Sequence, residues 1–168
     1  MIFVTVGSAL EPFTRLFEAM DDMAPRLGEE VLMQVGFCGW RGRNVRCTDY
    51  ATFGRIHDLV GQCSVLIGHG STGPVLMARR HGKPVIMVPR LAEFGETADA
   101  HPLEAARFVE RRGSRMTEVI YDVADLEAAV RRAQQKARDS LTYEPYPERE
   151  RLLAAIRAAV EGREIPTE

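Results

Sequence analysis

The residues GHGSTGP, Gly68 to Pro74, combine backbone and side-chain groups that are suited to holding a phosphate. Apolar runs flank them on both sides, so a buried strand should end here and a helix should begin. The first N–H groups of a helix lack partners and lie at the positive end of its dipole, which favours a phosphate or diphosphate. Glycine lets the backbone approach such a ligand without a Cβ in the way. The residues predicted to form this site are Gly70, Ser71, Thr72 and Gly73.

The same residues also fit a plain strand-to-helix turn, and the sequence leaves both interpretations open. Ser71 and Thr72 either donate to phosphate oxygens or cap the helix, and Pro74 suits a first helical turn because its missing N–H costs nothing there. The spacing matches neither the GxGxxG of dinucleotide-binding proteins nor the P-loop, since GK[ST] is absent. Neither NAD nor ATP is therefore indicated, and we expect no cofactor.

A second glycine turn, Gly7-Ser8, follows the first apolar run, Ile2 to Val6. In an open α/β sheet, ligands bind outside the carboxyl ends of the strands, where both turns should lie. Taken alone, Gly7-Ser8 fits a simple turn better than a binding site. Two such turns that converge on one crevice favour a nucleotide-sugar diphosphate as the ligand.

The elements that must position these turns follow from the hydrophobic periodicity of the chain. Short apolar or β-rich runs predict strands at residues 2–6, 30–35, 45–47, 65–67, 85–88 and 116–121. Helical spacing predicts helices from near Pro12 to Met23 and near residues 53–60, 72–81, 102–112, 125–138 and 148–161. This order predicts an α/β fold with an open, mainly parallel sheet and helices on both faces. We expect residues 1–168 to form a single domain, with the C-terminal helices from about residue 124 packing on it.

The composition is that of a soluble globular protein and excludes several function classes. Of the 168 residues, 45% are hydrophobic and 27% are charged. The net charge of −2 creates no basic field, so we expect no nucleic-acid partner. The cysteines Cys38, Cys47 and Cys63 form no CxxC pair and no zinc spacing, which fits a reducing compartment and predicts no metal site. No signal peptide and no apolar run of about 20 residues is present, which predicts a cytoplasmic protein and leaves a membrane partner open.

Several segments together resemble the C-terminal, donor-binding half of the family 28 glycosyltransferases. They are MIFVTVGS with PFTRLFEAMD, VLMQVG, CSVLIGHGSTGPVLMARRHGKPVIMVPR and PRLAEFGETADAHPLEAARFVERRG. The resemblance covers roughly residues 1–130 and is greatest to stand-alone versions of that half. These are the soluble subunit of the two-part UDP-GlcNAc transferase of dolichol-linked oligosaccharide synthesis and bacterial exopolysaccharide transferase subunits. The combination of segments is fairly specific, whereas no single segment is.

The resemblance implies a Rossmann-like domain, half of a GT-B enzyme, that binds a UDP-sugar with its diphosphate on the glycine loop. In full-length relatives the other half supplies the acceptor and the catalytic base. The resemblance therefore implies a hexosyltransferase that acts with a partner subunit, typically membrane-associated, on a lipid-linked or polysaccharide acceptor. Through that partner the protein would lie at the inner face of the membrane. A non-catalytic nucleotide-sugar-binding or scaffold protein stays open as an alternative, as does a homodimer that forms the cleft.

Four further residues are candidates for the site, each with a structural alternative. His69, where the family also has a histidine, would be catalytic by donating to the diphosphate or stabilising the leaving group, or would hold a neighbouring loop. Arg90 would neutralise phosphate charge, for which a bidentate guanidinium is suited, or lie exposed. Glu96 would bind sugar hydroxyls and His101 would contact the sugar or the phosphate. Their alternatives are a solvated glutamate and a histidine at a helix N-terminus.

The sequence departs from the family at the ribose. Aligned back from Gly82-Lys83-Pro84, the acidic residue with which the family holds the ribose hydroxyls falls at Met77, which cannot accept those hydrogen bonds. The polar pair before the following helix is also altered, to Asp99-Ala100-His101-Pro102. Both departures put recognition of ribose, and with it specificity for UDP, in question.

Two aromatic residues have two interpretations each. Phe53 belongs either to the core or to the apolar wall that, in the family, receives the base. Trp40 lies in the polar, glycine-rich segment FCGWRGR and serves either as a contact for a partner or membrane or as a cover for the core.

Overall fold

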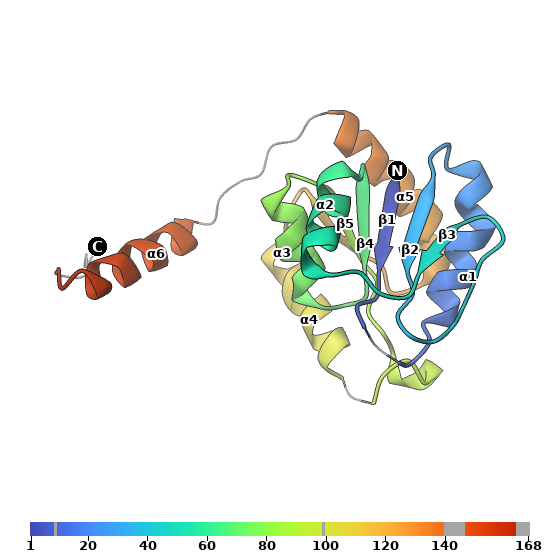
Figure 1. Ribbon diagram of the computed structural model, residues 1–168, viewed down its shortest axis with the longest axis horizontal. Coiled ribbons are helices and arrows are strands. Elements are labelled where there is room, and N and C mark those ends of the chain that lie inside the picture. Colours follow the sequence, from blue (N-terminus) through green and yellow to red (C-terminus); the bar gives the residue numbers. More distant parts are fainter. Residues whose placement is uncertain (9, 99, 140–146, 164–168) are drawn as a thin grey trace.

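Six strands, all within the described part of the chain, form one parallel sheet with helices on both faces (Figure 1). The computed structural model describes residues 1–8, 10–98, 100–139 and 147–163. The strands are β1 (Ile2–Thr5), β2 (Val31–Gln34), β3 (Arg46–Thr48), β4 (Val65–Gly68), β5 (Val85–Met87) and β6 (Thr117–Val119). The helices are α1 (Thr14–Met23), α2 (Phe53–Gln62), α3 (Thr72–Arg80), α4 (His101–Arg112), α5 (Leu126–Arg138) and α6 (Pro147–Val160). The predicted fold class is confirmed, as is the predicted order of strands and helices.

The strand order is β3-β2-β1-β4-β5-β6, and each neighbouring pair runs parallel. β1 is central, since Ile2 pairs with Val31 on one side and with Val65 on the other. The order therefore reverses between β1 and β4. In such a sheet the crevice outside the carboxyl ends of the two strands at the reversal is where ligands bind. Gly7 follows β1 there and Gly68 ends β4.

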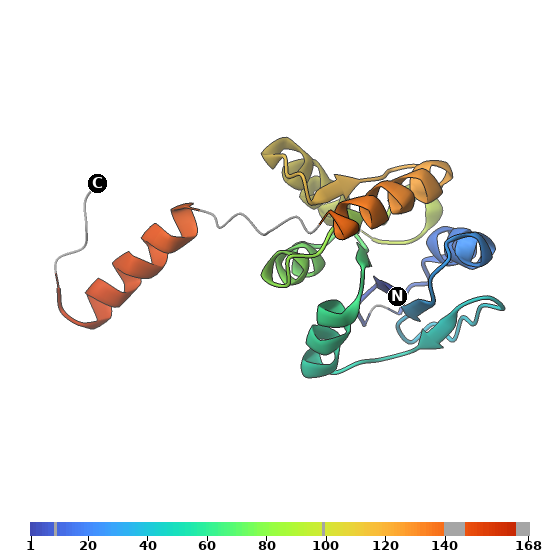
Figure 2. The same cartoon turned by 90° about the horizontal axis from the view of Figure 1, so that it is seen from above.

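Side chains of β1 point alternately into two cores, because successive residues of a strand face opposite sides of the sheet. Ile2 and Val4 pack with residues of α1 and α5 on one side. Phe3 packs with residues of α2, α3 and α4 on the other side. The sheet thus lies between two helical layers (Figure 2). Because both faces are covered, the central strands are apolar without alternation, which is why the sequence reveals them.

One polar pair interrupts the apolar strands at their carboxyl ends. The hydroxyl of Thr5 donates to Oε1 of Gln34 over 2.6 Å, and both side chains are buried. Each group therefore has a partner, which removes most of the cost of burying it. The pair fixes the ends of β1 and β2 directly below the first glycine turn.

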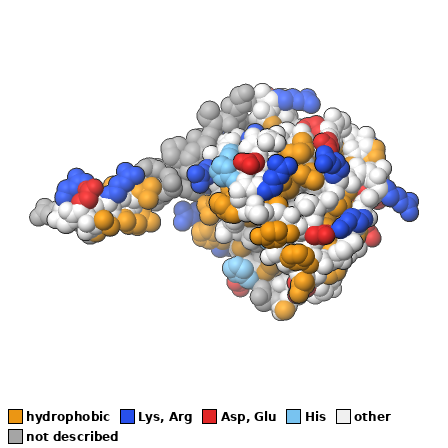
Figure 3. All heavy atoms as spheres, viewed as in Figure 1, with side chains coloured by type: hydrophobic (Ala, Val, Ile, Leu, Met, Phe, Trp, Pro, Cys, Tyr) orange, Lys and Arg blue, Asp and Glu red, His pale blue; other side chains and the backbone are white. Residues whose placement is uncertain are grey.

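The two C-terminal helices differ in their surroundings. α5 packs on the sheet, with Leu126 fully buried, whereas α6 stands apart from the sheet in both views (Figures 1 and 2). Residues 140–146, which join the two helices, lie outside the described residues. Along one side of α6, where hydrophobic side chains gather in Figure 3, Leu152, Ile156 and Val160 are 60%, 49% and 82% exposed. The packing of α6 on the domain therefore stays a prediction.

Candidate functional site

The two glycine turns lie side by side at the reversal of the strand order. Gly7 has a φ of +72°, and a Cβ built on it would lie 3.3 Å from Cε1 of His69. The ring of His69 therefore packs against the backbone of the first turn. Glycine at position 7 permits both the left-handed backbone and this close approach. The structure thus brings Gly7 and His69 together, as the sequence predicts for two turns at one crevice.

No side chain among the described residues caps the N-terminus of α3. Ser71 precedes the helix with extended backbone, yet its side chain makes no capping hydrogen bond. α2 provides the contrast, because there the hydroxyl of Thr52 accepts from the N–H of Arg55 at 3.3 Å. The plain capped turn that the sequence left open is therefore not what α3 shows. Its first-turn amides, at Thr72 and Gly73, lie where an anion is favoured by the helix dipole.

The structure requires glycine at position 70 of the loop but not at position 73. Gly70 has a φ of +82°, and a Cβ on it would lie only 2.7 Å from Cα of Pro89, so packing alone requires glycine there. At Gly73 a Cβ would meet nothing closer than Oγ of Ser71 at 3.8 Å, and its φ lies outside the left-handed region. Nothing in the described part of the protein therefore demands glycine at position 73. A methyl group at this position would make only an ordinary van der Waals contact with Ser71, and Gly73 lines a cavity.

A cavity of about 440 Å³ opens beside this end of α3. It lies between α2 and α3 and is lined almost wholly by apolar side chains. The lining residues are Thr5, Gly7, Phe53, Ile56, Val60, Leu66, His69, Gly73, Pro74, Leu76, Met77 and Arg80. A cavity of this size and character is typical of a site for a small organic molecule.

His69 is placed to accept a hydrogen bond at the inner end of the cavity. Its Nδ1 lies 3.1 Å from the carbonyl oxygen of Thr5, and because a carbonyl only accepts, Nδ1 carries the proton. Burial lowers the pKa of His69, and the charge of Arg90 adds to that effect, while the hydrogen bond to Thr5 opposes it. The ring is therefore neutral, with Nε2 unprotonated on the side of Gly7. The bond to Thr5 is the loop-holding contact that the sequence left as the alternative; the catalytic role stays a prediction.

The lowered pKa of His69 predicts that the protein loses stability in mild acid. The unfolded chain takes up the proton below about pH 6.5, whereas the folded protein resists protonation until a lower pH. Stability is thus full above about pH 6.5 and falls as the pH drops from there toward the folded-state pKa. Urea unfolding from about pH 8 to about pH 5 should show this fall, and a His69→Asn variant should show a shallower one.

His81 provides the control for this measurement. Its pKa is also lowered, first by burial and then by the neighbouring charge of His57, so it contributes in the same direction. A His81→Gln variant should remove only the contribution of His81 to the pH dependence of stability. The part of the pH dependence that is due to His69 should remain. An unchanged slope in His69→Asn would contradict the assignment.

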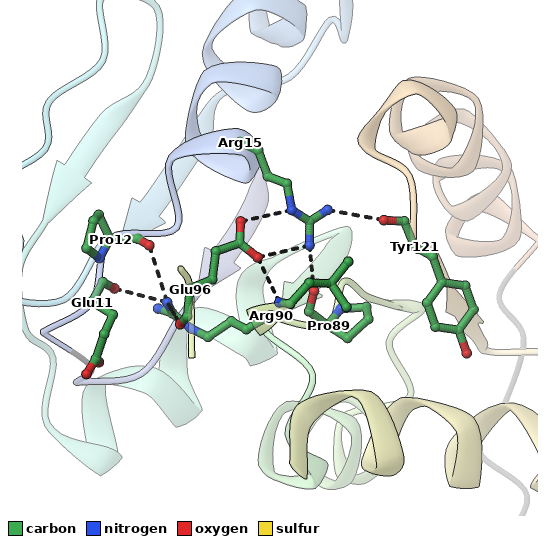
Figure 4. A network of polar contacts seen from close by, with 8 residues as sticks. Glu11, Pro12, Arg15, Pro89, Arg90, Glu96 and Tyr121 are labelled. Atoms are coloured by element: carbon green, nitrogen blue, oxygen red, sulfur yellow. Dashed lines mark hydrogen bonds and ion pairs between the residues drawn. The ribbon is translucent and has the colours of Figure 1, made fainter. Parts of the chain in front are cut away.

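Arg90 and Glu96 are bonded within the protein and do not line the cavity. Both are 4% exposed. Glu96 accepts from Nε and Nη2 of Arg15 at 2.9 and 3.1 Å and from the N–H of Leu91 at 2.9 Å (Figure 4). Nη1 of Arg90 donates to the carbonyl oxygens of Glu11 and Glu96, each at 3.0 Å. The network clamps the loop after β5 onto the start of α1.

This network changes the interpretation of two residues that the sequence predicts for the site, Arg90 and Glu96. Arg90 is neither exposed nor turned into the cavity: its guanidinium lies 4.9 Å from the ring centre of Phe13, and Nε and Nη2 have no partner among the described residues. Glu96 is not a solvated glutamate but the buried partner of Arg15. A direct contact of either side chain with substrate stays a prediction. Sequence reasoning did not find Arg15, because an arginine near a helix N-terminus reads as a surface residue.

The remaining predicted residues lie around the mouth of the site. Ser8 is exposed beyond the first turn, and His101 is exposed at the first position of α4. α4 begins close to the glycine loop, since a Cβ on Gly70 would lie 3.1 Å from Cβ of Pro102. Asp99, part of the altered polar segment, lies outside the described residues. Their roles in binding stay predictions.

The two aromatic residues with open interpretations are both placed. Phe53 is 71% exposed and lines the cavity, so it is a wall of the site and not a core residue. The ring of Trp40 lies 5.1 Å from that of Phe17, with which it covers the core.

Among the described residues no group of histidine, cysteine and carboxylate side chains is arranged to hold a metal ion. No helix in the described ranges has the length and apolar composition of a membrane span.

Comparisons with known proteins agree with this architecture. The model of the glycosyltransferase family 28 C-terminal domain matches residues 1–155. Among solved structures, CalG4, the calicheamicin glycosyltransferase, is 20% identical with a TM-score of 0.54 over 83% of this chain and 37% of its own. The glycosyltransferase SnogD from Streptomyces nogalater is 20% identical with a TM-score of 0.50 over 91% of this chain and 43% of its own.

A putative UDP-N-acetylglucosamine 2-epimerase from Listeria monocytogenes is 15% identical with a TM-score of 0.50 over 99% of this chain and 46% of its own. At identities this low, the structural similarity shows a shared fold alone, which is the Rossmann-like half of a GT-B protein. The chain spans less than half the length of each of the three proteins. A comparison with the sequences of curated proteins finds no match. The match over residues 1–155 establishes that the chain belongs to glycosyltransferase family 28, as its C-terminal domain.

Proposed function

We propose that the chain is the donor-binding part of a hexosyltransferase. It takes a sugar from a nucleoside diphosphate, for which the family resemblance implies UDP, and passes it to a hydroxyl of a lipid-linked or polysaccharide acceptor, as in exopolysaccharide synthesis. The observation that carries the proposal is the uncapped N-terminus of α3 beside an apolar cavity at the reversal of the strand order. A diphosphate on the helix and a nucleoside in the cavity match these two neighbouring environments.

The geometry supports a role in charge stabilisation during transfer. As the bond between the sugar and the diphosphate breaks, the leaving nucleotide gains negative charge. The amides of Thr72 and Gly73 and the dipole of α3 lie where they stabilise that charge without rearrangement. A diphosphate next to His69 favours the protonated ring, whose Nε2 then donates to it. This charge stabilisation uses only residues of this chain and needs no cofactor, whereas the base that takes the proton of the acceptor hydroxyl would come from the partner.

A partner subunit would supply the acceptor side. The family resemblance implies that the acceptor and the catalytic base come from the other half of the fold. Near the carboxyl ends of β2 and β3, Phe37 and Tyr50 stack on each other with ring centres 6.1 Å apart, and each is 56% exposed. This pair and, separately, the apolar side of α6 are exposed hydrophobic surfaces that suit a protein contact. We propose a membrane-associated partner that holds the protein at the cytoplasmic face of the membrane; a second copy of the chain is the alternative.

Replacing Gly73 by alanine tests the placement of the diphosphate. A methyl group there occupies the open space beside the first-turn amides, so calorimetry should show a Kd for UDP that rises at least about 10-fold. The fold has room for the methyl group, and alanine favours helix more than glycine does. The midpoint of thermal unfolding should therefore stay the same or rise.

Gly54→Ala is the matched control. Gly54 is likewise the second residue of its helix and has open space around its Cβ position, but it does not line the cavity. Its Kd for UDP should equal that of the unchanged protein. Equal affinities for Gly73→Ala and Gly54→Ala would place the diphosphate elsewhere.

An assay of sugar transfer tests the catalytic role. Transfer of sugar should be slight for the chain alone and should appear when the partner is added. Binding of the nucleotide sugar without transfer, even with the partner, identifies a non-catalytic nucleotide-sugar-binding protein instead.

A further inference from the structure

The side chains that line the cavity beside α3 offer few hydrogen-bond acceptors. If the diphosphate lies on α3, as the proposed function requires, the nucleoside lies in this cavity, because it opens directly beside Gly73. Its walls are the apolar side chains of α2 and α3, with Phe53 and Met77 among them. Among the described residues, no carboxylate or amide side chain and no hydroxyl group other than that of Thr5 lines it.

The few polar side chains of the lining are mostly engaged or are donors only. The hydroxyl of Thr5 donates to Gln34 at 2.6 Å and accepts weakly from the N–H of Gly7 at 3.4 Å. Nδ1 of His69 is engaged by the carbonyl oxygen of Thr5. Arg80, at the rim, carries donors and no acceptor. Among the described residues of the lining, Nε2 of His69 is thus the one side-chain acceptor without a partner. It is lost as well when the ring takes a proton to face the diphosphate.

Ribonucleosides and 2′-deoxyribonucleosides differ in the number of hydrogen-bond acceptors that their sugar rings need. Ribose carries two neighbouring hydroxyls, each with a proton that needs an acceptor, whereas 2′-deoxyribose carries one. A hydroxyl proton that leaves water and finds no acceptor weakens binding. Because the side chains of the lining offer almost no acceptor, a ribose leaves one more hydroxyl proton without a side-chain partner than a deoxyribose does. The apolar Met77 side chain, in contact with the hydrophobic core between α2 and α3, suits the C–H face at C2′ of the deoxy sugar.

We propose that this protein selects a 2′-deoxyribonucleoside diphosphate sugar over its ribonucleoside counterpart, through the acceptor-poor wall that Met77 forms. The inference rests on the proposed function, since it assigns the nucleoside to the cavity beside the diphosphate. It concerns the sugar ring of the nucleotide and not the sugar that is transferred. Selection of this kind by an apolar pocket is limited to about one to two orders of magnitude in affinity.

Calorimetry on the full chain with four nucleotides tests the inference: UDP, dUDP, 5-methyl-UDP and dTDP. This set varies the 2′-hydroxyl and the 5-methyl group independently. We expect each deoxy compound to bind at least about 5-fold more tightly than its ribo counterpart, with or without the methyl group. Equal affinities, or tighter binding of the ribo compounds, overturn the inference while leaving nucleotide binding intact. If none of the four binds, the proposed function itself is wrong.

Variants of Met77 test whether this side chain is responsible. Met77→Glu introduces an acceptor and should raise the affinity for UDP relative to dUDP at least about 5-fold. Met77→Leu keeps the wall apolar at similar size and should preserve the preference of the unchanged protein. The ratio of the two affinities is compared within each variant, so a loss of stability common to both nucleotides does not affect it. A ratio that is the same in Met77→Glu and Met77→Leu contradicts the role of this residue.

Discussion

Replacing Gly70 by alanine is expected to lower the free energy of unfolding by about 3 to 5 kcal/mol. Two costs combine at this position. The φ of +82° is strained for any residue with a Cβ, and the new methyl group would lie 2.7 Å from Cα of Pro89. Because the opposing atom belongs to the backbone of a proline, it cannot rotate away, and the loop after β5 must shift. Urea unfolding measured at one pH gives the change in free energy.

A glycine with the same backbone strain but no crowding provides the control. Gly82, which follows α3, has a φ of +62° and nothing within 4 Å of its Cβ position. Gly82→Ala should therefore cost only the strain of the left-handed backbone, about 1 kcal/mol. The difference between the two variants measures the contact between Gly70 and Pro89. Equal losses would show that this contact is not tight.

Most of the fold was predictable because helices cover both faces of the sheet. A strand buried on both sides is a short apolar run, so β1, β4 and β5 are visible in the sequence as such. Helical periodicity between the runs then fixes the order of the elements, with bounds that differ from the observed ones by one or two residues. The spatial order of the strands was not predictable, since the pairing of β1 with β4 joins residues about 63 positions apart. Local patterns carry no information on such a pairing.

The candidate site was predictable in its backbone and not in its side chains. A cluster of glycines has few possible structural roles, so the loop around Gly70 and Gly73 stands out in a single sequence. A charged residue has many possible roles, and whether it is buried depends on a partner elsewhere in the chain. Glu96, for example, pairs with Arg15, 81 positions earlier. The cavity lining was missed for a related reason. Val60 and Leu66 have the periodicity of core residues, and only the assembled layers show that a space remains beside them.

Breaking the Arg15–Glu96 pair is expected to cost about 3 to 5 kcal/mol of stability when one partner is removed alone. Arg15 and Glu96 are 15% and 4% exposed, so the partner that remains is a largely buried charge that has lost its ion pair. In an Arg15→Met variant the carboxylate of Glu96 keeps, among the described residues, the N–H of Leu91 as its one donor. The carbonyl oxygens of Pro89 and Tyr121 lose their bonds to Arg15 at 2.6 and 3.1 Å. Urea unfolding of Arg15→Met and Glu96→Gln measures both losses.

The double variant separates the ion pair from its surroundings. Arg15→Met with Glu96→Gln removes both charges, and the amide oxygen of glutamine still accepts from Leu91. It should therefore be more stable than the sum of the single losses predicts, with a coupling free energy of at least about 2 kcal/mol. The exposed pair Arg46–Glu30, at 74% and 49% exposure, is the control, and its removal should cost no more than about 1 kcal/mol and less in high salt. A coupling as small as that of the exposed pair would mean that water reaches Glu96. The loop after β5 would then be held on α1 by its backbone contacts and not by charge.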